Sequence, residues 1–285
     1  MNEKASTDMI ELVQSRWAQD LSIPLERAGY VTRLADNLML GHLSPETRAE
    51  FQSADGGELN DDGRRPAKMR ALISSSALAV NFFDAWRRVP AEPLATALGL
   101  GEPIVRVRFE YKCADYPIGP RSPNLDVMLT TMSGRRIAIE CKFLEAYRNP
   151  GKRAPLSEKY FPPGLGVWSA AHLPRAQALA NNESARWRYL DASQLLKHLL
   201  GLRSDKSPGD VELLYLWYDT GSDDAVAHRE EIERFAAIVK EENAEDAVCF
   251  RSMTYQELFG ALVLSEAVLP SGWATYMSQR YFQSQ

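Results

Sequence analysis

The chain has 285 residues and is 45% hydrophobic, which is enough for one large domain or two small domains with a substantial core. Its N-terminus has neither the basic start nor the apolar run of a secretory signal. No stretch approaches the roughly 18 apolar residues that a membrane span needs. Three widely spaced cysteines favour neither a disulfide framework nor a zinc site. We therefore expect a soluble, cytoplasmic protein with no membrane segment.

The net charge of −5 is unevenly distributed along the chain. Residues 223–246 hold nine acidic and three basic residues, so the rest of the chain is close to neutral. Two basic clusters occur elsewhere: Arg64, Arg65, Lys68 and Arg70, and then Arg148, Lys152, Arg153 and Lys159. Such clusters could neutralise the phosphates of a nucleic acid, although solvated loops have the same composition. The charge alone leaves the partner open.

The first part of the chain has the composition of helices. Apolar positions predict helices within residues 6–51, interrupted at Pro24 and by the Ser-Pro-Glu at 44–46. A polar stretch rich in glycine and aspartate, 53–63, is predicted to be a loop. We expect residues 1–73 to form an N-terminal helical elaboration.

The main domain is predicted to begin with a helix over 74–88, where a serine is available as the N-cap and the large apolar side chains share one stripe. A short helix near 92–98 follows and ends at a glycine. We expect residues 74–285 to form this domain and to pack with the N-terminal elaboration as one unit.

From residue 104 the hydrophobic period changes from that of a helix to that of a strand. Residues 104–112 alternate between apolar and polar positions, as a half-buried strand does. Two apolar runs, 124–131 and 135–144, flank a Ser-Gly turn and predict a β-hairpin. The near-continuous apolar run 211–219 is typical of a strand that is covered on both faces. Helices before, between and after these strands indicate an α/β fold.

Helices are also predicted around and after the last of these strands. Residues 168–202 have a helical pattern, with Asp191 or Ser193 as a cap and Gly201 as the stop of the last part. The acidic segment contains an amphipathic helix. A capping box over 254–257 opens the final predicted helix.

The predicted hairpin carries charged residues where a buried strand should have none. Side chains alternate between the two faces of a strand, so Glu140 and Lys142 share one face of the second strand. If the turn has two residues, Ser-Gly, then Asp126 of the first strand lies opposite Cys141, and Glu140 points the other way.

A three-residue turn gives a different arrangement. With Met132 added to the turn and the glycine left-handed, Thr131 pairs with Arg135. Asp126 then lies directly across from Glu140, with Cβ atoms about 5 Å apart. Only this register gathers the two carboxylates and the lysine on one surface, and the sequence is compatible with both turns.

Two carboxylates at this distance repel each other, and a cation between them would relieve the repulsion. Oxygen ligands without His or Cys favour a hard ion such as Mg²⁺, which takes one or two protein carboxylates and keeps several waters. Lys142 beside such a site could hold or deprotonate an attacking water, or stabilise charge that develops on a phosphoryl group. The alternative is that Glu-x-Lys on an edge strand only discourages aggregation.

These residues resemble the motif of the PD-(D/E)XK phosphodiesterase superfamily, which has the restriction-endonuclease-like fold. The similarity covers Pro123 and Asp126, and the E-C-K of Glu140, Cys141 and Lys142. It departs from the motif where P-N-L-D replaces an adjacent Pro-Asp. The resemblance implies an αβββαβ core, with a mixed sheet flanked by helices and helical additions at the N- and C-terminal ends.

The resemblance also implies a metal-dependent nuclease that hydrolyses nucleic-acid phosphodiester bonds, in DNA more than in RNA, with a metal-activated water. Asp126 and Glu140 would be metal ligands together with the main-chain carbonyl of Cys141, and Lys142 would lie at the attacking water. The implied ion is Mg²⁺, with Mn²⁺ as a substitute. Some branches of the superfamily place a glutamine beside the site on the following helix, which makes Gln194 a further candidate.

Other residues have weaker arguments. Gln194 and His198 share one face of a predicted helix, and a solvated face is the alternative. Glu145 could bind a second metal only if the strand bulges, because its offset from Glu140 favours the opposite face. Asn81 lies among apolar residues of the 74–88 helix, and we expect it to be a hydrogen-bonded polar group of the core.

The stretch 148–167 is rich in proline and glycine and is predicted to be a long loop. Tyr147, with the basic residues Arg148, Lys152 and Arg153, could clamp a phosphate backbone there.

A rival hypothesis is a nuclease-fold binding or assembly subunit that no longer cleaves. The acidic net charge and the lack of a recognisable DNA-reading module favour it, whereas the retained Asp126, Glu140 and Lys142 favour an enzyme. Under either hypothesis we expect a nucleic acid, more DNA than RNA, as a partner, no membrane contact, and either a homodimer or a separate partner subunit.

Overall fold

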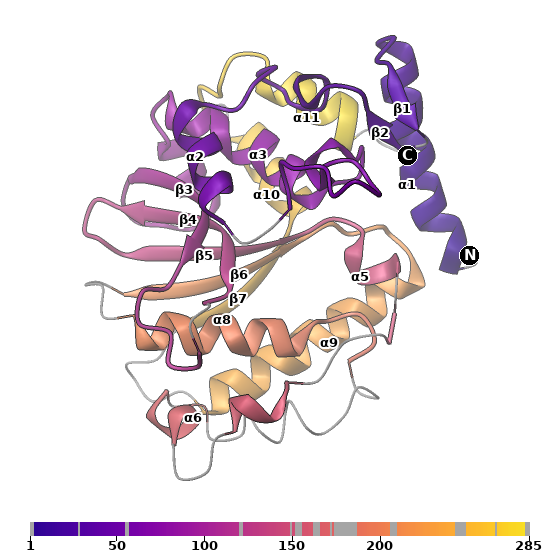
Figure 1. Cartoon of the computed structure of the whole chain (residues 1–285). Helices are drawn as coiled ribbons and strands as arrows, with labels where there is room; N and C mark the ends of the chain where they lie inside the picture. The colour runs from indigo at the N-terminus through magenta and orange to yellow at the C-terminus, as the bar shows by residue number, and fades with distance from the viewer. Residues whose placement is uncertain are drawn as a thin grey trace.

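A five-stranded sheet with the strand order β3-β4-β5-β6-β7 lies at the centre of the computed structural model (Figure 1). Its strands are β3 (Ile104–Lys112), β4 (Asn124–Thr131), β5 (Arg136–Lys142), β6 (Val211–Trp217) and β7 (Cys249–Thr254). Strand β4 is antiparallel to both β3 and β5, whereas β5, β6 and β7 run parallel to one another. The sheet is therefore mixed, and the four predicted strands are confirmed, with small differences at their ends.

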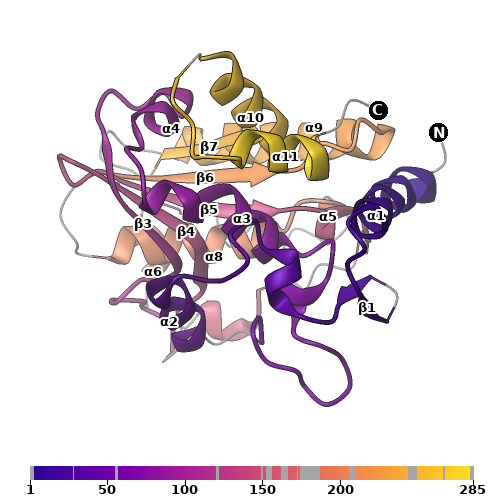
Figure 2. The same cartoon turned by 90° about the horizontal axis from the view of Figure 1, so that it is seen from above.

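Helices cover both faces of the sheet. Figure 2 shows α3 (Ser75–Phe83), α10 (Tyr255–Leu264) and α11 (Trp273–Tyr281) on one face, and α8 (Ala192–Ser204) on the other, where α9 (Asp223–Glu242) also lies (Figure 1). The predicted α/β class, a mixed sheet flanked by helices, is confirmed. The structure describes residues 3–27, 29–54, 57–119, 122–148, 150–151, 156–161, 166–171, 173, 187–205, 210–242, 249–265 and 267–282.

Burial explains the composition of the middle strands. Every residue of β5 except Lys142 is buried, and so is every residue of β6 except Val211, because helices cover both faces. Strand β7 was not predicted. Only Thr254 of this strand is buried, so its sequence shows neither an apolar run nor a clear alternation.

The N-terminal region contains a hairpin as well as helices. After α1 (Glu3–Asp20), the strands β1 (Leu25–Arg27) and β2 (Tyr30–Val31) form an antiparallel pair. The prediction of helix for 25–31 is therefore wrong, and the turn contains Gly29 with a φ of 80°, a conformation that a helix does not contain. The region continues with η1 (Leu34–Asn37), α2 (Pro45–Ser53) and η2 (Lys68–Arg70).

Helix α3 follows its predicted pattern. Ser74 is the N-cap, and its side chain accepts a hydrogen bond from Ala77 N at 3.1 Å. The predicted segment 74–88 continues past α3 as a 3₁₀ turn, η3 (Asp84–Arg87). The next helix, α4 (Glu92–Ala97), ends shortly before Gly99, which has a φ of 69°.

Two predictions about helices in the C-terminal half are wrong. Helix α8 begins after Asp191, whose side chain accepts a hydrogen bond from Gln194 N at 2.9 Å, but it continues past Gly201. A Cβ at position 201 would lie 3.3 Å from Cys113 Sγ, so this glycine permits close packing and does not stop the helix. Helix α10 opens with the predicted capping box, yet α11 follows it, so α10 is not the last helix.

The described parts of the segment between β5 and α8 contain three short helices. They are α5 (Glu145–Arg148), η4 (Glu158–Tyr160) and α6 (Val167–Ala170). Lys152 and Arg153, which were predicted to clamp phosphate, lie outside the described residues. Within the described part of the chain, no helix combines the length and apolarity that crossing a membrane requires.

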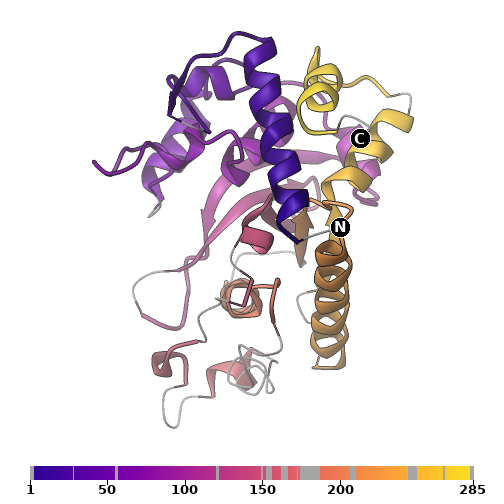
Figure 3. The same cartoon turned by 90° about the vertical axis from the view of Figure 1, so that its right-hand side faces the viewer.

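A buried arginine joins the N-terminal region to the last helix. The guanidinium of Arg280, in α11, donates hydrogen bonds to Gln14 Oε1 at 3.1 Å, Asn37 O at 2.9 Å and Tyr276 Oη at 2.6 Å. Its centre lies 4.0 Å from the centroid of the Trp17 ring. Figure 3 shows α1, which carries Gln14 and Trp17, beside the C-terminal helices. These partners are neutral, so polar acceptors and an aromatic face stabilise the buried charge.

Replacing Arg280 should therefore destabilise the fold. Arg280→Ala leaves several buried acceptors without a donor, and we expect the free energy of unfolding to fall by about 3–4 kcal/mol. Urea denaturation measures this change, and Arg16→Ala, at an exposed position of α1, is the matched control that should change it by less than about 0.5 kcal/mol. A loss below about 1 kcal/mol for Arg280→Ala would show that this junction contributes little.

Candidate active site

The turn between β4 and β5 has three residues. Thr131 N donates a hydrogen bond to Arg135 O at 2.9 Å, and Gly134 has a φ of 92°, in the left-handed region that glycine favours. The ladder keeps this register toward the other end of the hairpin, which sets Asp126 across from Glu140. Of the two turns compatible with the sequence, the structure has the one that gathers the charges on one face.

Glu140 is buried between two basic side chains. Lys142 Nζ donates a hydrogen bond to Glu140 Oε1 at 2.6 Å. His198 Nε2 lies 2.9 Å from Oε2, although the angle of this contact is not that of a hydrogen bond. Burial raises the pKa of Glu140, but the charge of Lys142 and the contact with His198 outweigh it and lower the pKa to about 2. Glu140 is therefore ionised at neutral pH.

The pKa of Asp126 is shifted in the opposite direction. Its Oδ2 accepts a hydrogen bond from Cys141 N at 2.7 Å. Burial and the repulsion from Glu140 raise the pKa of Asp126 well above its usual value. An ionised carboxylate thus faces one that resists ionisation, and a cation bound between them would favour the charged form of both.

Helix α8 supplies two side chains to this site. Gln194 Oε1 accepts a hydrogen bond from Lys142 Nζ at 2.9 Å, and His198, one turn later, contacts Glu140. The shared helix face therefore points at the hairpin and not at solvent. Burial lowers the pKa of Lys142, but the charges of Glu140 and Asp126 outweigh it and raise the pKa above its usual value, so the amine is protonated at neutral pH.

These side chains open into a cleft of about 380 Å³. Its other walls include Glu58, Lys68, Arg148 and the start of α3 at Ser74, Ser75 and Ser76. Lys68 Nζ lies 3.1 Å from Glu58 Oε1, and an Arg148 guanidinium nitrogen lies 2.7 Å from Glu11 Oε1. The basic side chains that line the cleft are thus already engaged in ion pairs.

Glu145 lines the same cleft, although its sequence offset favoured the opposite face. The odd spacing between Glu140 and Glu145 predicts opposite faces only if the strand continues to Glu145. Strand β5 instead ends at Lys142, and Glu145 begins α5. Its Oε2 accepts a hydrogen bond from Phe143 N at 2.8 Å, which holds the carboxylate close to the end of the strand. The end of β5, and not a bulge, turns the Glu145 side chain into the cleft.

Glu110 is a further acidic group of the cleft that the sequence analysis missed. It lies in β3 on the rung beside Asp126, and its φ of 51° is uncommon for any residue other than glycine. Burial raises its pKa to about 7 against the hydrogen bond from Asn124, and the charges of Glu58 and Glu140 add to the effect. No sequence signal pointed to Glu110, because it occupies an ordinary polar position of an alternating strand.

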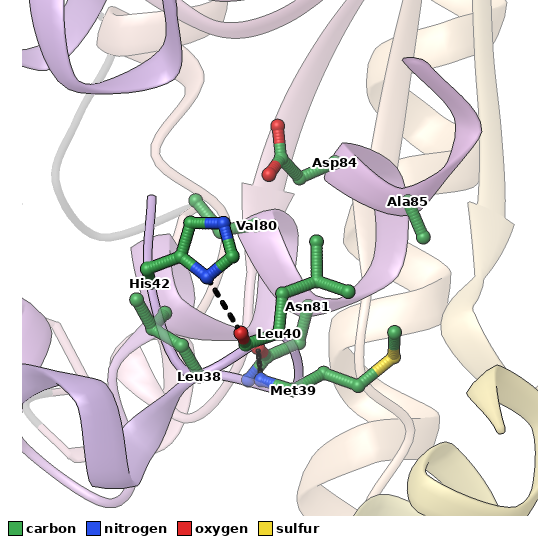
Figure 4. Close-up of a pocket in the computed structure, with 8 residues that line it drawn as sticks. All are labelled: Leu38, Met39, Leu40, His42, Val80, Asn81, Asp84 and Ala85. Carbon is green, nitrogen blue, oxygen red and sulfur yellow. Dashed lines mark hydrogen bonds between the residues drawn. The ribbon is translucent and has the colours of Figure 1, made fainter. Parts of the chain in front are cut away.

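Asn81 lies outside the site, as expected. Its Oδ1 accepts a hydrogen bond from Met39 N at 2.7 Å (Figure 4). Its Nδ2 donates a hydrogen bond to Asn37 O at 3.0 Å. Figure 4 also shows His42 Nδ1 against Leu40 O, at 2.8 Å. The pocket that these residues line has no room for a water molecule, and Asn81 is a buried, hydrogen-bonded polar group of the core.

Tyr147 does not act as an exposed stacking platform. It is buried, and its Oη lies 3.2 Å from His228 Nδ1 and 3.3 Å from Tyr218 O. The prediction that Tyr147 helps to clamp a phosphate backbone is therefore wrong. Arg148 does line the cleft.

The groups at the hairpin that could bind a metal ion all offer oxygen atoms. Within the described ranges, no group of three or more His, Cys, Asp and Glu side chains is arranged to hold a metal ion. The hairpin instead offers two facing carboxylates next to the main chain of Cys141, beside a cleft with room for water. Together with a protonated lysine, this arrangement could bind an anionic substrate and a hard cation at one place.

A mixed sheet with facing acids and a lysine at a cleft is compatible with a nuclease of the restriction-endonuclease-like class. The comparison with protein families agrees, since the family described as restriction endonuclease associating with ARP matches residues 14–282. The chain therefore belongs to this restriction endonuclease family, which indicates a hydrolytic nuclease. Comparisons with curated proteins and with solved structures found no match.

The raised pKa of Glu110 predicts how stability depends on pH in the absence of metal. A folded-state pKa above the unfolded value contributes stability that is present at about pH 4.5 and below and is lost as the pH rises through about 7. Glu110→Gln carries no charge at any pH. In EDTA we expect the variant to match the wild type near pH 4.5 and to be more stable by about 2 kcal/mol near pH 8.5.

Urea denaturation at the two pH values measures this difference. A stability difference between the wild type and Glu110→Gln that stays constant between them would contradict the raised pKa.

Proposed function

We propose that the protein is a metal-dependent nuclease of the PD-(D/E)XK kind that hydrolyses nucleic-acid phosphodiester bonds, in DNA more than in RNA. The observation that carries the proposal is the convergence of Asp126, Glu140 and Lys142 on one face of the hairpin, with Gln194 held against the lysine. The order α3, β3, β4, β5, α8, β6 along the chain supports an αβββαβ core.

The residues present fit a hard divalent cation. Asp126 and Glu140 would hold Mg²⁺, or Mn²⁺ as a substitute, with the main-chain carbonyl of Cys141. Mg²⁺ takes one or two carboxylates and keeps several waters, so a third acidic ligand is not required. Oε2 of buried Glu140 accepts no hydrogen bond, although His198 Nε2 lies 2.9 Å away, and the pKa of Asp126 is raised. Both observations support the fit, since a cation would stabilise each carboxylate.

A bound Mg²⁺ would supply Lewis acidity and lower the pKa of a coordinated water. Lys142 is protonated in the metal-free site, and in this form it would donate hydrogen bonds to the attacking water or to a phosphate oxygen and stabilise negative charge. Gln194 orients Lys142 through its 2.9 Å hydrogen bond, and His198 borders the far oxygen of Glu140. Holding these groups in place before substrate binds lowers the cost of reaching the transition state.

The family description supports a partner as well as a substrate. Its wording, restriction endonuclease associating with ARP, supports association of this chain with an ARP protein in addition to nucleic acid. A homodimer that cleaves both strands of a duplex remains the alternative arrangement.

A second candidate function is a nuclease-fold binding or assembly subunit that does not cleave. One observation favours it: Glu140 already has Lys142 Nζ against one carboxylate oxygen and His198 Nε2 near the other. If these contacts outcompete a cation, the fold would bind nucleic acid or its partner without hydrolysis.

Plasmid nicking separates the two candidates. Purified protein should convert supercoiled plasmid to nicked or linear forms with Mg²⁺ and not with EDTA. Glu140→Gln should lower the rate by at least about 10²-fold, because a cation ligand is lost while the shape of the side chain is kept. Glu230→Gln, the same change at an exposed position of α9, should leave the rate unchanged.

Cleavage that persists in Glu140→Gln would place the chemistry elsewhere. Intact plasmid with Mg²⁺ and with Mn²⁺, from protein that binds nucleic acid, would support the non-cleaving subunit.

A further inference from the structure

Two arginines of strand β3 are exposed and form no ion pair with a carboxylate in the part of the chain that the structure describes. Arg106 and Arg108 are both exposed to solvent. Among the described residues, neither lies within ion-pair distance of a carboxylate, and the Arg108 guanidinium lies over the Tyr111 ring, 5.0 Å from its centroid. Two unneutralised cations thus stand two positions apart on one strand.

The sheet register places both arginines on the face that carries the candidate active site. Arg108 pairs with Met128 and Arg106 pairs with Thr130, and residues 126, 128 and 130 share one face of β4. The same strand continues to Glu110 in the cleft. At 3.3–3.4 Å per residue, Arg108 lies about 7 Å and Arg106 about 13 Å along the strand from Glu110. The pair therefore forms a line that leads away from the cleft.

The cleft itself offers a polyanion little free positive charge. Its basic side chains Lys68, Lys142 and Arg148 are held in ion pairs with Glu58, Glu140 and Glu11. The cleft also contains Asp126, Glu110 and Glu145. A nucleic acid that brings a phosphodiester to this site needs cations beyond the cleft to bind its other phosphates, because the basic side chains of the cleft are already paired with acids.

The geometry points to Arg106 and Arg108 as the phosphate-binding track of the substrate: they bind two backbone phosphates of a DNA strand and hold it along β3 so that a phosphodiester enters the cleft at Asp126 and Glu140. This inference rests on the proposed nuclease function and names the surface that delivers its substrate. Guanidinium groups suit the role because their planar donors match phosphate oxygens. Phosphate contacts of this kind position a duplex and carry no sequence information.

A different role would also account for charges at this place. Strand β3 is at the edge of the sheet, and charged side chains on an edge strand discourage pairing with another molecule. Edge protection and phosphate binding differ in their dependence on salt when DNA is bound, because a phosphate contact releases counterions and edge protection does not.

The test is the salt dependence of DNA affinity. Fluorescence anisotropy with a short fluorescein-labelled duplex, at a fixed low Ca²⁺ concentration in place of Mg²⁺, gives the association constant between about 50 and 200 mM KCl. For Arg106→Gln/Arg108→Gln we expect the slope of log K against log [KCl] to become shallower by about 1.8, which is the loss of two phosphate contacts, with affinity at least about tenfold weaker near 0.1 M salt. In plasmid cleavage the same variant should raise KM and leave kcat unchanged.

The control is Arg16→Gln/Arg88→Gln, which removes the same charge from exposed positions of α1 and of the turn after η3. It should keep the wild-type slope. A wild-type slope in the β3 variant, an equal loss of slope in the control, or a wild-type protein that does not bind DNA would each overturn the assignment. A protein that binds with the expected slopes but does not cleave would remove the nuclease proposal and leave the track in place.

Discussion

The three-residue turn between β4 and β5 determines whether the protein has a site at all. Because side chains alternate along a strand, a shift of one residue in the pairing would move Glu140 and Lys142 to the face opposite Asp126. Gly134 adopts the left-handed conformation that the longer turn needs, and the ladder then keeps the two acids on adjacent strands of one surface. A local backbone requirement at one glycine thus decides where three charges meet.

Gathering these charges in a half-buried place is costly, and the rest of the site reduces that cost. Lys142 neutralises the charge of Glu140, and Gln194 accepts a hydrogen bond from Lys142. The main-chain N–H of Cys141 donates a hydrogen bond to Asp126. Helix α8 covers this face of the sheet and brings Gln194 and His198 to the hairpin from successive turns. What stays unbalanced is Asp126 and, next to it, Glu110, whose pKa values are raised. A hard cation would stabilise the charged forms of these carboxyl groups, and the proposed nuclease chemistry uses this property.

Much of this arrangement could be predicted from the sequence, for identifiable reasons. The alternation of 104–112 and the apolar runs of β4, β5 and β6 follow directly from burial, and these strands lie where they were expected. The turn length could be narrowed to two alternatives and not decided, because Ser-Gly fits both. Strand β7 and the hairpin at 25–31 were missed, since short and poorly buried strands have no hydrophobic period to detect.

The residues of the site likewise could be predicted only where the local sequence carries a signal. Asp126, Glu140 and Lys142 were found because three charges within strands conflict with burial, and Gln194 was found from a resemblance. Glu110 sits at a polar position of an alternating strand, and its unusual backbone conformation has no counterpart in its residue type. Gly201 was expected to stop a helix, but its actual constraint is the approach of Cys113, a tertiary contact that local sequence does not contain.

In the proposed site, Asp126 and Glu140 share a cation beside Lys142. The most direct test of this shared cation is an anomalous difference map from a crystal of the wild-type protein grown with Mn²⁺. We predict a peak within about 2.2 Å of a carboxylate oxygen of each acid and of the carbonyl oxygen of Cys141. A map with no peak between the two strands would contradict a shared cation. So would a structure in which Lys142 is still hydrogen-bonded to Glu140 and the ion lies elsewhere in the cleft.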